Sequence, residues 1–238
     1  MVLIVILRIT QNIELFANQW FPTLFVVSSL SMIGGNILAL VQTSVKRLLA
    51  YSSIAHSGYM ALVLCAMGAG RDLPYEAILF YLIGYVLTSV LAFGTLMWLE
   101  DTERQNLQIE DLRGLMRSHP WAAFVMAAAM FSFAGMPPTV GFFAKFFIFN
   151  AALREHLYFL VIIGALSSVI SLYYYLRIVV VMYMQKPDSK ASTLTPRSSI
   201  VMNVLLTCTC GAVLIFGTVF PEQILAQLKP IATKLSQR

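Results

Sequence analysis

A single lysine interrupts the most aromatic run of this chain. Lys145 lies within the run FFAKFFIF at residues 142–149, shortly after the pair Pro137-Pro138. An ammonium group at membrane depth costs about 3 kcal/mol on insertion scales, and chains keep such a charge mainly where it serves ion or proton movement. The prolines break or kink a helix, and the freed backbone groups must then be satisfied within the protein or by a water-filled cavity. A broken helix that carries a lysine therefore indicates ion transport.

Composition supports a location in the membrane. The chain is 59% hydrophobic and only 11% charged, whereas soluble domains carry about 25% charged residues. Its apolar stretches reach the length of about 20 residues that a spanning helix needs. The net charge of +5 fits basic loops beside a membrane, and no basic stripe indicates nucleic-acid binding.

The sequence predicts an all-α integral membrane protein with about six transmembrane helices. The expected spans are about 21–41, 48–69, 77–98, 121–152, 157–183 and 199–220. The fourth is too long for one straight helix and contains Pro137-Pro138, so we expect two half-helices with the break at Gly135, Pro137 and Pro138. Residues 20–220 would form one polytopic domain. Residues 1–19 would be the remnant of an upstream helix and loop, and residues 221–238 a C-terminal tail.

The loop charges predict an orientation. One side would hold Lys46, Arg47, Arg104, Arg113, Arg117, Lys186, Lys190 and Arg197, and the other would hold Arg8, Arg71, Arg154, Lys229, Lys234 and Arg238. Because Lys and Arg are enriched in cytoplasmic loops, the first side is expected to be cytoplasmic, with the C-terminus on the opposite side.

A second polar constellation follows the first loop. Lys46 and His56 are ten residues apart, or about 15 Å along a helix. If Lys46 marks the membrane interface, His56 lies near the bilayer midplane, where an imidazole with an ordinary pKa of about 6.5 can exchange protons near neutral pH. Four polar side chains around it would hold water or relay protons: Ser52, Ser53, Ser57 and Tyr59.

Each of these residues also has a plainer interpretation. Lys46 and Arg47 can be an ordinary interfacial basic pair, and His56 can be a core histidine that bonds to a neighbouring helix. Lys145 can extend outward to the interface, because Ala152, near the expected end of its span, is only seven residues away. The adjacent helix break favours a buried Lys145.

Other kinds of site receive no support. The three cysteines, Cys65, Cys208 and Cys210, fall in apolar stretches without partner ligands, so we expect neither a zinc site nor a disulfide. The sequence shows no Walker motif, nucleophile elbow or haem attachment site. No metal site and no catalytic redox centre is therefore expected in this chain.

The two constellations, in this order, resemble the proton-pumping, antiporter-like membrane subunits of respiratory complex I, and most closely the subunit N branch of that family. Residues 31–59 and the stretch AGMPPTVGFFAKF at residues 134–146 carry the resemblance, with Tyr173-Tyr174-Tyr175-Leu176-Arg177 downstream. The resemblance implies that Lys145 lies on a discontinuous helix and His56 on a polar axis along the membrane centre. Lys46 matches a lysine of the family.

The resemblance covers essentially the whole chain, but only helices nine to fourteen of the family's fourteen-helix fold. It implies a proton-translocating subunit of an NADH:quinone oxidoreductase. NADH, FMN, iron–sulfur clusters and quinone would be bound by partner subunits and no cofactor by this chain. The implied partners are other membrane-arm subunits, the lipid bilayer and a separate N-terminal piece of the same subunit, with no nucleic acid. The implied location is the bacterial inner membrane, with organellar inner or thylakoid membranes as the alternative.

Two other functions stay open at this point. One is a subunit of a multi-subunit cation/proton antiporter, and the other is a non-transporting fragment that only scaffolds a complex. The family's glutamate–lysine pair and its earlier helix-break lysine would precede Met1. A split gene, a wrongly assigned start and a degraded copy would each produce this pattern.

Overall fold

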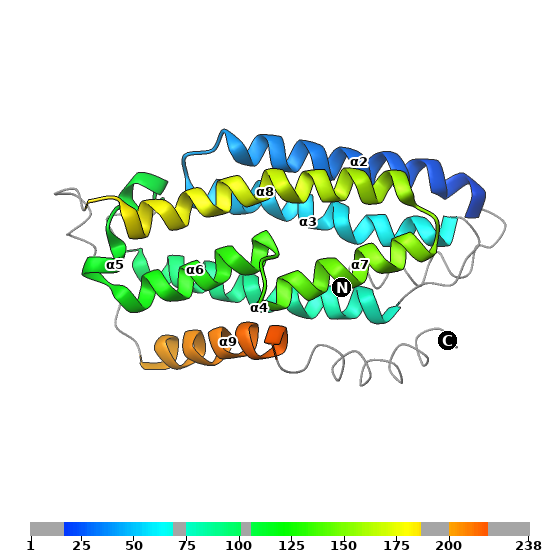
Figure 1. Cartoon of the computed structure of the whole chain (residues 1–238). Coiled ribbons are helices and arrows are strands. Elements are labelled where there is room, and N and C mark those ends of the chain that lie inside the picture. The colour runs from blue at the N-terminus through cyan, green and yellow to red at the C-terminus, as the bar shows by residue number, and fades with distance from the viewer. Residues whose placement is uncertain (1–16, 69–74, 101–105, 187–199, 219–238) are drawn as a thin grey trace.

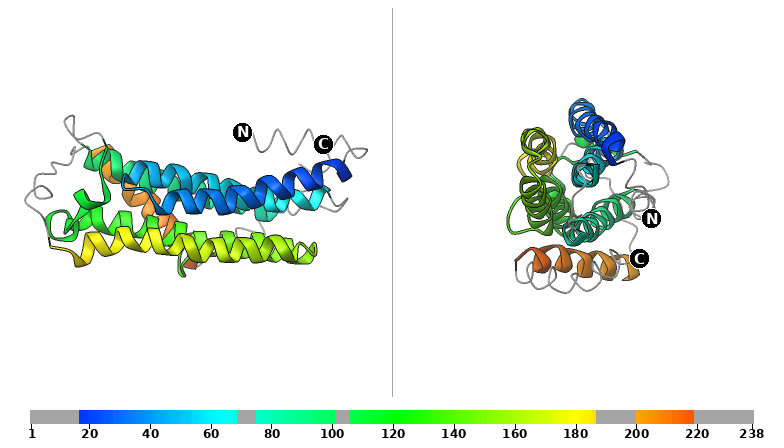
Figure 2. Two further views of the ribbon diagram at one scale, coloured as in Figure 1. Left: turned by 90° about the horizontal axis from the view of Figure 1, so that it is seen from above. Right: turned by 90° about the vertical axis from the view of Figure 1, so that its right-hand side faces the viewer.

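A computed structural model describes residues 17–68, 75–100, 106–186 and 200–218 of the chain. In these ranges the helices lie side by side with their long axes roughly aligned, as Figures 1 and 2 show. The long helices are α2 (Ala17–Leu40), α3 (Val45–Gly68), α4 (Tyr75–Leu99), α6 (Pro120–Ala134), α7 (Val140–Arg154), α8 (Tyr158–Met184) and α9 (Ile200–Thr218). Two short elements, η2 (Ile109–Leu112) and α5 (Leu115–Ser118), connect α4 to α6.

Five of these helices are long and apolar enough to cross a membrane. The candidate spans are Phe21–Leu40, Val45–Cys65, Glu76–Leu99, Tyr158–Met184 and Ile200–Gly217. Helices α6 and α7 have 15 residues each, or about 22 Å of length, so neither alone reaches across a hydrocarbon core of about 30 Å. They follow one another end to end across a break (Figure 1). The predicted fold class, with a discontinuous fourth span, is confirmed.

The half-helices lie at the centre of the packing. Helices α2 and α3 form an antiparallel pair, α8 packs on α2 and α6, and α4 packs on both α6 and α7. Helix α9 covers α4, α6 and α7 from the side away from α2 (Figure 2). Most of α6 is buried, and the helix is rich in alanine. Small side chains of this kind let neighbouring helices approach closely.

The outward faces of the other helices are apolar. Leu30 of α2, Val169 of α8 and Ile200 of α9 are among the large hydrophobic side chains that these helices expose. An exposed apolar band of this kind is expected of helices that meet lipid, since the bilayer core favours the same residues as a protein core.

A compact connecting layer closes one end of the bundle. The Val45 N–H donates to the Leu107 carbonyl (3.1 Å), and the Ile109 N–H donates to the Thr43 carbonyl (2.9 Å). These bonds tie the α2–α3 turn to the chain that leads into η2. Of the eight basic residues predicted for the cytoplasmic side, five are described and lie in turns or helix ends of this layer: Lys46, Arg47, Arg113, Arg117 and Lys186.

The remaining predictions, about the two termini and three of the loop charges, concern residues that the structure does not describe. Residues 1–16 and the tail at 221–238 lie outside the described residues, as do Arg104, Lys190 and Arg197. The division into a remnant, a membrane domain and a tail therefore stays a prediction, and so does the orientation.

Candidate functional site

The break between α6 and α7 is built by one glycine and two prolines. Gly135 has a φ of 79° and a ψ of 41°, the left-handed conformation in which glycine is favoured because it lacks a Cβ. Pro137 and Pro138 follow, joined by a cis peptide bond, and neither has an N–H to continue a helix. Helix α7 begins only at Val140. The break lies where the sequence predicted it.

Lys145 reaches back from α7 to the end of α6. Its Nζ donates to the carbonyl oxygens of Phe133 (3.0 Å) and Ala134 (3.1 Å) and to the Ser168 hydroxyl (3.0 Å). The residue is only 6% exposed. Lys145 is therefore buried at the break, and the alternative in which it extends outward to the interface is wrong for this structure.

These contacts complete the hydrogen bonding of α6. The last four carbonyls of a helix have no partner within the helix. Here the Met136 N–H donates to the Phe131 carbonyl (3.0 Å) and the Gly135 N–H donates to the Ser132 carbonyl (3.0 Å). The ammonium of Lys145 donates to the two remaining carbonyls, those of Phe133 and Ala134. The ammonium also lies at the negative end of the α6 dipole. The broken helix thus provides the counter-charge that a buried lysine needs.

The helices around the break touch at glycine residues. A Cβ added to Gly141 of α7 would collide with the Ser132 carbonyl oxygen, and one added to Gly217 of α9 would collide with the backbone from Pro138 to Val140. The half-helices and α9 are therefore held in close backbone contact, which fixes the position from which Lys145 extends.

His56 occupies the neighbouring part of the interior. It lies near the middle of α3, and its Nδ1 is 2.6 Å from the Tyr81 hydroxyl of α4. Its Nε2 is 3.3 Å from the Tyr175 hydroxyl of α8. The Tyr175 hydroxyl in turn shares a hydrogen bond with the Ser52 hydroxyl, one turn before His56 on α3. The ring is packed against Phe133 of α6, with 5.3 Å between ring centroids.

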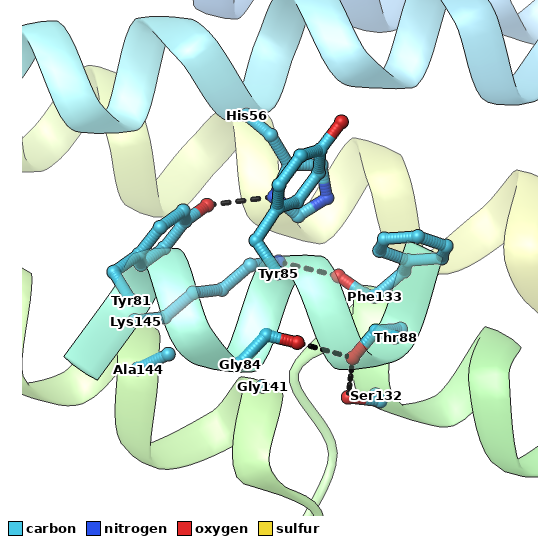
Figure 3. Close-up of a pocket in the computed structure, with 10 residues that line it drawn as sticks. All are labelled: His56, Tyr81, Gly84, Tyr85, Thr88, Ser132, Phe133, Gly141, Ala144 and Lys145. Carbon is cyan, nitrogen blue, oxygen red and sulfur yellow. Dashed lines mark hydrogen bonds between the residues drawn. The ribbon is translucent and has the colours of Figure 1, made fainter. Parts of the chain in front are cut away.

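Lys145 and His56 line the same small cavity (Figure 3). Its volume is about 10 Å³, close to the smallest space that holds one water molecule. The other lining residues are Tyr81, Gly84, Tyr85, Thr88, Ser132, Phe133, Gly141 and Ala144. The Thr88 and Ser132 hydroxyls in this lining are 2.8 Å apart. A water here would lie between two groups that can each hold a proton.

The remaining predicted residues divide by their position on α3. Ser52, His56 and Tyr59 share one face of the helix because they are separated by four and three residues, and the Tyr59 ring lies 5.4 Å from Lys145 Nζ. Ser53 and Ser57 lie on the adjacent face. Their hydroxyls donate to the carbonyls of their own helix, at Ala50 (2.6 Å) and Ile54 (2.7 Å). The structure does not bring Ser53 and Ser57 to His56.

Lys46 also lies apart from the cluster. Its Nζ is 2.6 Å from the Glu100 carboxylate at the end of α4, and its side chain is 41% exposed. This ion pair belongs to the connecting layer at the end of the bundle. Between Lys46 and Ser52 the inward face of α3 carries Leu48, which is fully buried.

Comparison with known proteins identifies the family. The family model described as "NADH:quinone oxidoreductase/Mrp antiporter, TM" matches residues 1–171. The chain belongs to this family. It is 46% identical over 170 residues to NADH-quinone oxidoreductase subunit N of Paramagnetospirillum magneticum, a match that covers 71% of the chain and 34% of that relative. The match thus spans only about a third of the length of this relative.

Solved structures have the same fold. A chain of respiratory complex I from Thermus thermophilus with bound aureothin superposes with a TM-score of 0.75 at 33% identity, covering 86% of this chain and 45% of its own length. A chain of the Mrp complex from Dietzia sp. gives 0.77 at 19% identity, covering 93% and 49%, and shows the fold alone. The family, its bacterial relatives and the apolar helices indicate a multi-pass protein of the bacterial inner membrane.

For this member of the family, sequence reasoning misses the partners of His56. No pattern in the sequence singles out Tyr81, and Tyr175 enters only as part of a motif. Both are buried and lie within spanning helices, whereas tyrosines of membrane proteins are enriched at the two interfaces. A tyrosine more than one helical turn inside a span is therefore the available signal.

No metal-binding cluster is found in the part of the chain that the structure describes. No three His, Cys, Asp or Glu side chains of these residues lie close enough to hold an ion. Cys65, Cys208 and Cys210 are free thiols. The buried polar side chains of these helices include Lys145, His56 and Asn36, together with several hydroxyl groups.

Proposed function

We propose that this chain is a proton-translocating part of the membrane arm of an NADH-quinone oxidoreductase, and that Lys145 and His56 carry its proton path. The observation that carries the proposal is a lysine buried at a helix break that shares a water-sized cavity with a buried histidine. Intramembrane ionisable residues in such positions characterise ion and proton pathways. The relative named subunit N supports the choice of complex.

In the proposed mechanism, Lys145 alternates between two protonation states. The charged state is stabilised by the carbonyls of Phe133 and Ala134 and by the dipole of α6. A change of charge elsewhere in the complex would shift this balance, so that Lys145 releases its proton to the cavity. His56 would take up that proton, because the imidazole lines the same cavity and its unprotonated ring nitrogen can bind a proton.

The redox chemistry would occur in other subunits. NADH, FMN, iron–sulfur clusters and quinone would be bound there, while this chain would respond to their electrostatic or conformational signal. Its partners would be other membrane-arm subunits. This chain is then part of an oxidoreductase complex without supplying the reacting centre.

A second candidate is a subunit of a cation/proton antiporter. Its support is the fold shared with the Mrp complex from Dietzia sp. and the family's description, which includes both kinds of protein. The same lysine and histidine would then carry protons in exchange for a cation that crosses the membrane in the opposite direction. Proton movement that requires NADH oxidation favours the first function. Movement driven by an imposed sodium gradient, without NADH, favours the second.

The test counts protons per electron in membrane vesicles that contain the assembled complex. Lys145→Ala is expected to abolish or strongly reduce this ratio while the complex still assembles. His56→Ala is expected to reduce it less, because water can fill part of the space. Lys186→Ala, which removes an exposed lysine beyond α8, is the control and should behave as wild type. A wild-type ratio in Lys145→Ala would contradict the proposal and favour a scaffold role.

A further inference from the structure

The ammonium of Lys145 has one hydrogen-bond partner for each of its hydrogens. A lysine ammonium carries three N–H donors and no acceptor. Its Nζ donates to the carbonyl oxygens of Phe133 (Figure 3) and Ala134 and to the Ser168 hydroxyl of α8. These three oxygens therefore satisfy the charged state completely.

All three partners are uncharged. No aspartate or glutamate is found among the described residues that bond the ammonium or line its cavity. A neighbouring carboxylate would favour the charged form of a lysine. Here the charge is held by hydrogen bonds and by the dipole of α6 instead.

Loss of a proton changes what the amine needs from its partners. A neutral amine has two N–H groups and one lone pair, so it needs two acceptors and one donor. A backbone carbonyl can only accept, whereas a serine hydroxyl has one O–H donor and two acceptor lone pairs. Of the three groups bonded to Lys145, Ser168 is therefore the one that can serve both protonation states.

The hydrogen of the Ser168 hydroxyl is available for this change. The Ser168 oxygen accepts from Lys145, and its own hydrogen is donated to none of the residues that the structure describes. The Tyr59 hydroxyl is buried, forms no hydrogen bond of normal geometry with the described residues, and is close enough to Ser168 and Asn36 to interact with both. The Tyr59 oxygen can therefore accept from Ser168 while Lys145 is charged.

We propose that Ser168 is a positioning residue whose hydroxyl reverses its hydrogen bond to Lys145 each time the lysine loses or regains its proton. The hydroxyl accepts from the ammonium and donates to the neutral amine. The proposal rests on the proposed function, and it explains how the neutral amine is accommodated at the helix break.

The steps balance, and no proton passes through Ser168. One N–H bond of the ammonium breaks, and its proton moves through the shared cavity to the unprotonated nitrogen of His56, as in the proposed function. The electron pair of that bond stays on Nζ, and rotation about the Cε–Nζ bond turns it toward Ser168. The O–H bond of Ser168 rotates without breaking, so the serine stays neutral. When a proton returns to the amine, the hydroxyl turns back toward Tyr59.

The competing explanation is that the Ser168 hydroxyl only ties α8 to α7. The chain contains a matched control. Ser171 lies three residues later on α8, is buried, and donates its hydroxyl to the backbone carbonyl of Ser168 (2.7 Å). It has no hydrogen bond to Lys145 in the described structure. Ser168→Ala and Ser171→Ala therefore remove the same group from one helix, but only the first removes a partner of the lysine.

The first measurement is the number of protons per electron in membrane vesicles, together with the amount of assembled complex. Without the hydroxyl, the ammonium lacks one acceptor and the neutral amine lacks its donor. These losses are unequal, because a bond to a charged group contributes more, so the balance between the two states is displaced. We expect Ser168→Ala to lower the ratio to about half of wild type or less, and Ser171→Ala to keep the wild-type ratio.

A second pair of variants separates the hydroxyl from the packing. Threonine and valine have nearly the same shape, but only threonine carries a hydroxyl. Ser168→Thr should therefore keep a higher ratio than Ser168→Val at equal assembly. A role in packing alone predicts equal ratios in these two variants.

The second measurement observes the hydroxyl directly. Infrared difference spectra are recorded on addition of NADH to the assembled complex, with and without ¹³C at the Cβ of serine. We expect a label-sensitive serine signal in the wild type and in Ser171→Ala that is absent in Ser168→Ala. A hydroxyl that keeps one hydrogen-bonding role throughout the cycle would give no such signal.

The outcomes separate the reversal from the proposed function. Equal ratios in Ser168→Thr and Ser168→Val, or a wild-type spectrum without a serine signal, overturn the reversal. If Lys145→Ala still has a reduced ratio, the proposed function stands. A wild-type ratio in Lys145→Ala overturns the proposed function itself. If the variants of Ser168 do not assemble, the serine signal of the wild type decides.

Discussion

Gly135→Ala tests how the helix break holds the lysine. An alanine at this position must adopt the left-handed conformation of Gly135, which costs a residue with a Cβ about 1–2 kcal/mol. The new Cβ would lie 2.9 Å from Lys145 Cδ and 3.4 Å from its Nζ. The flexible lysine can move away, but the ammonium then loses one of its hydrogen bonds to the carbonyls of α6. A bond to a charged group contributes about 1.5–3 kcal/mol, so the two effects together predict a destabilisation of about 2.5–5 kcal/mol.

Gly34→Ala provides the matched control. Gly34 lies within α2, and no heavy atom lies within 4 Å of the position that its Cβ would take. Alanine is favoured over glycine inside a helix by about 1 kcal/mol. The same chemical change is therefore expected to be neutral or stabilising at residue 34 and destabilising at residue 135.

The assay compares thermal unfolding of the purified complex and protons per electron in vesicles for the two variants. Gly135→Ala should unfold at a lower temperature than wild type and should pump fewer protons per electron, because its ammonium is displaced from the end of α6. Gly34→Ala should unfold at the wild-type temperature or above it and should keep the wild-type ratio of protons per electron. Equal stability and equal pumping in the two variants would refute the argument that Gly135 positions Lys145.

Two further substitutions address the packing and the surface. Gly141→Ala should prevent stable assembly, as measured by the amount of complex on native gels, because its Cβ collides with the rigid Ser132 carbonyl; a normal amount would show that α6 and α7 can separate at little cost. Lys46→Ala removes a partly exposed ion pair with Glu100, worth at most about 1 kcal/mol, so assembly should persist and pumping should fall less than in Lys145→Ala. An equal fall would place Lys46 within the proton path.

The sequence is sufficient to predict the helix break, and the break favours burial of Lys145 over extension to the interface. Pro137 and Pro138 act locally, because a missing N–H breaks a helix whatever surrounds it. The cost of a charge in an apolar run is likewise a property of the run itself. The number of consecutive apolar residues that a spanning helix needs is set by the thickness of the bilayer. These features need no knowledge of which helices are neighbours.

The partners of these residues cannot be predicted in the same way. That Lys145 bonds the carbonyls of Phe133 and Ala134 depends on how α7 turns back past the break. That His56 meets Tyr81 and Tyr175 depends on the packing of α3 against α4 and α8, which no local pattern encodes. Such contacts arise only when the helices assemble.

The helix period corrects one prediction about the serines of α3. Proximity in sequence groups Ser53 and Ser57 with Ser52 and Tyr59 around His56, but a helix has 3.6 residues per turn. Ser52 and Tyr59 are seven residues apart and therefore lie on one line along the helix, close to His56. Ser53 and Ser57 are four residues apart and lie on a second line, turned by about a third of a turn from the first. The period alone therefore separates the two pairs.

The most direct test of the account is whether Lys145 changes its protonation state during turnover. Infrared difference spectra of the assembled complex, labelled with ε-¹⁵N lysine, report the ammonium group on addition of NADH. We expect an isotope-sensitive lysine signal in the wild type that is absent in Lys145→Ala. A wild-type spectrum without a lysine signal, or the same signal in Lys145→Ala, would contradict the claim that this buried amine carries the proton.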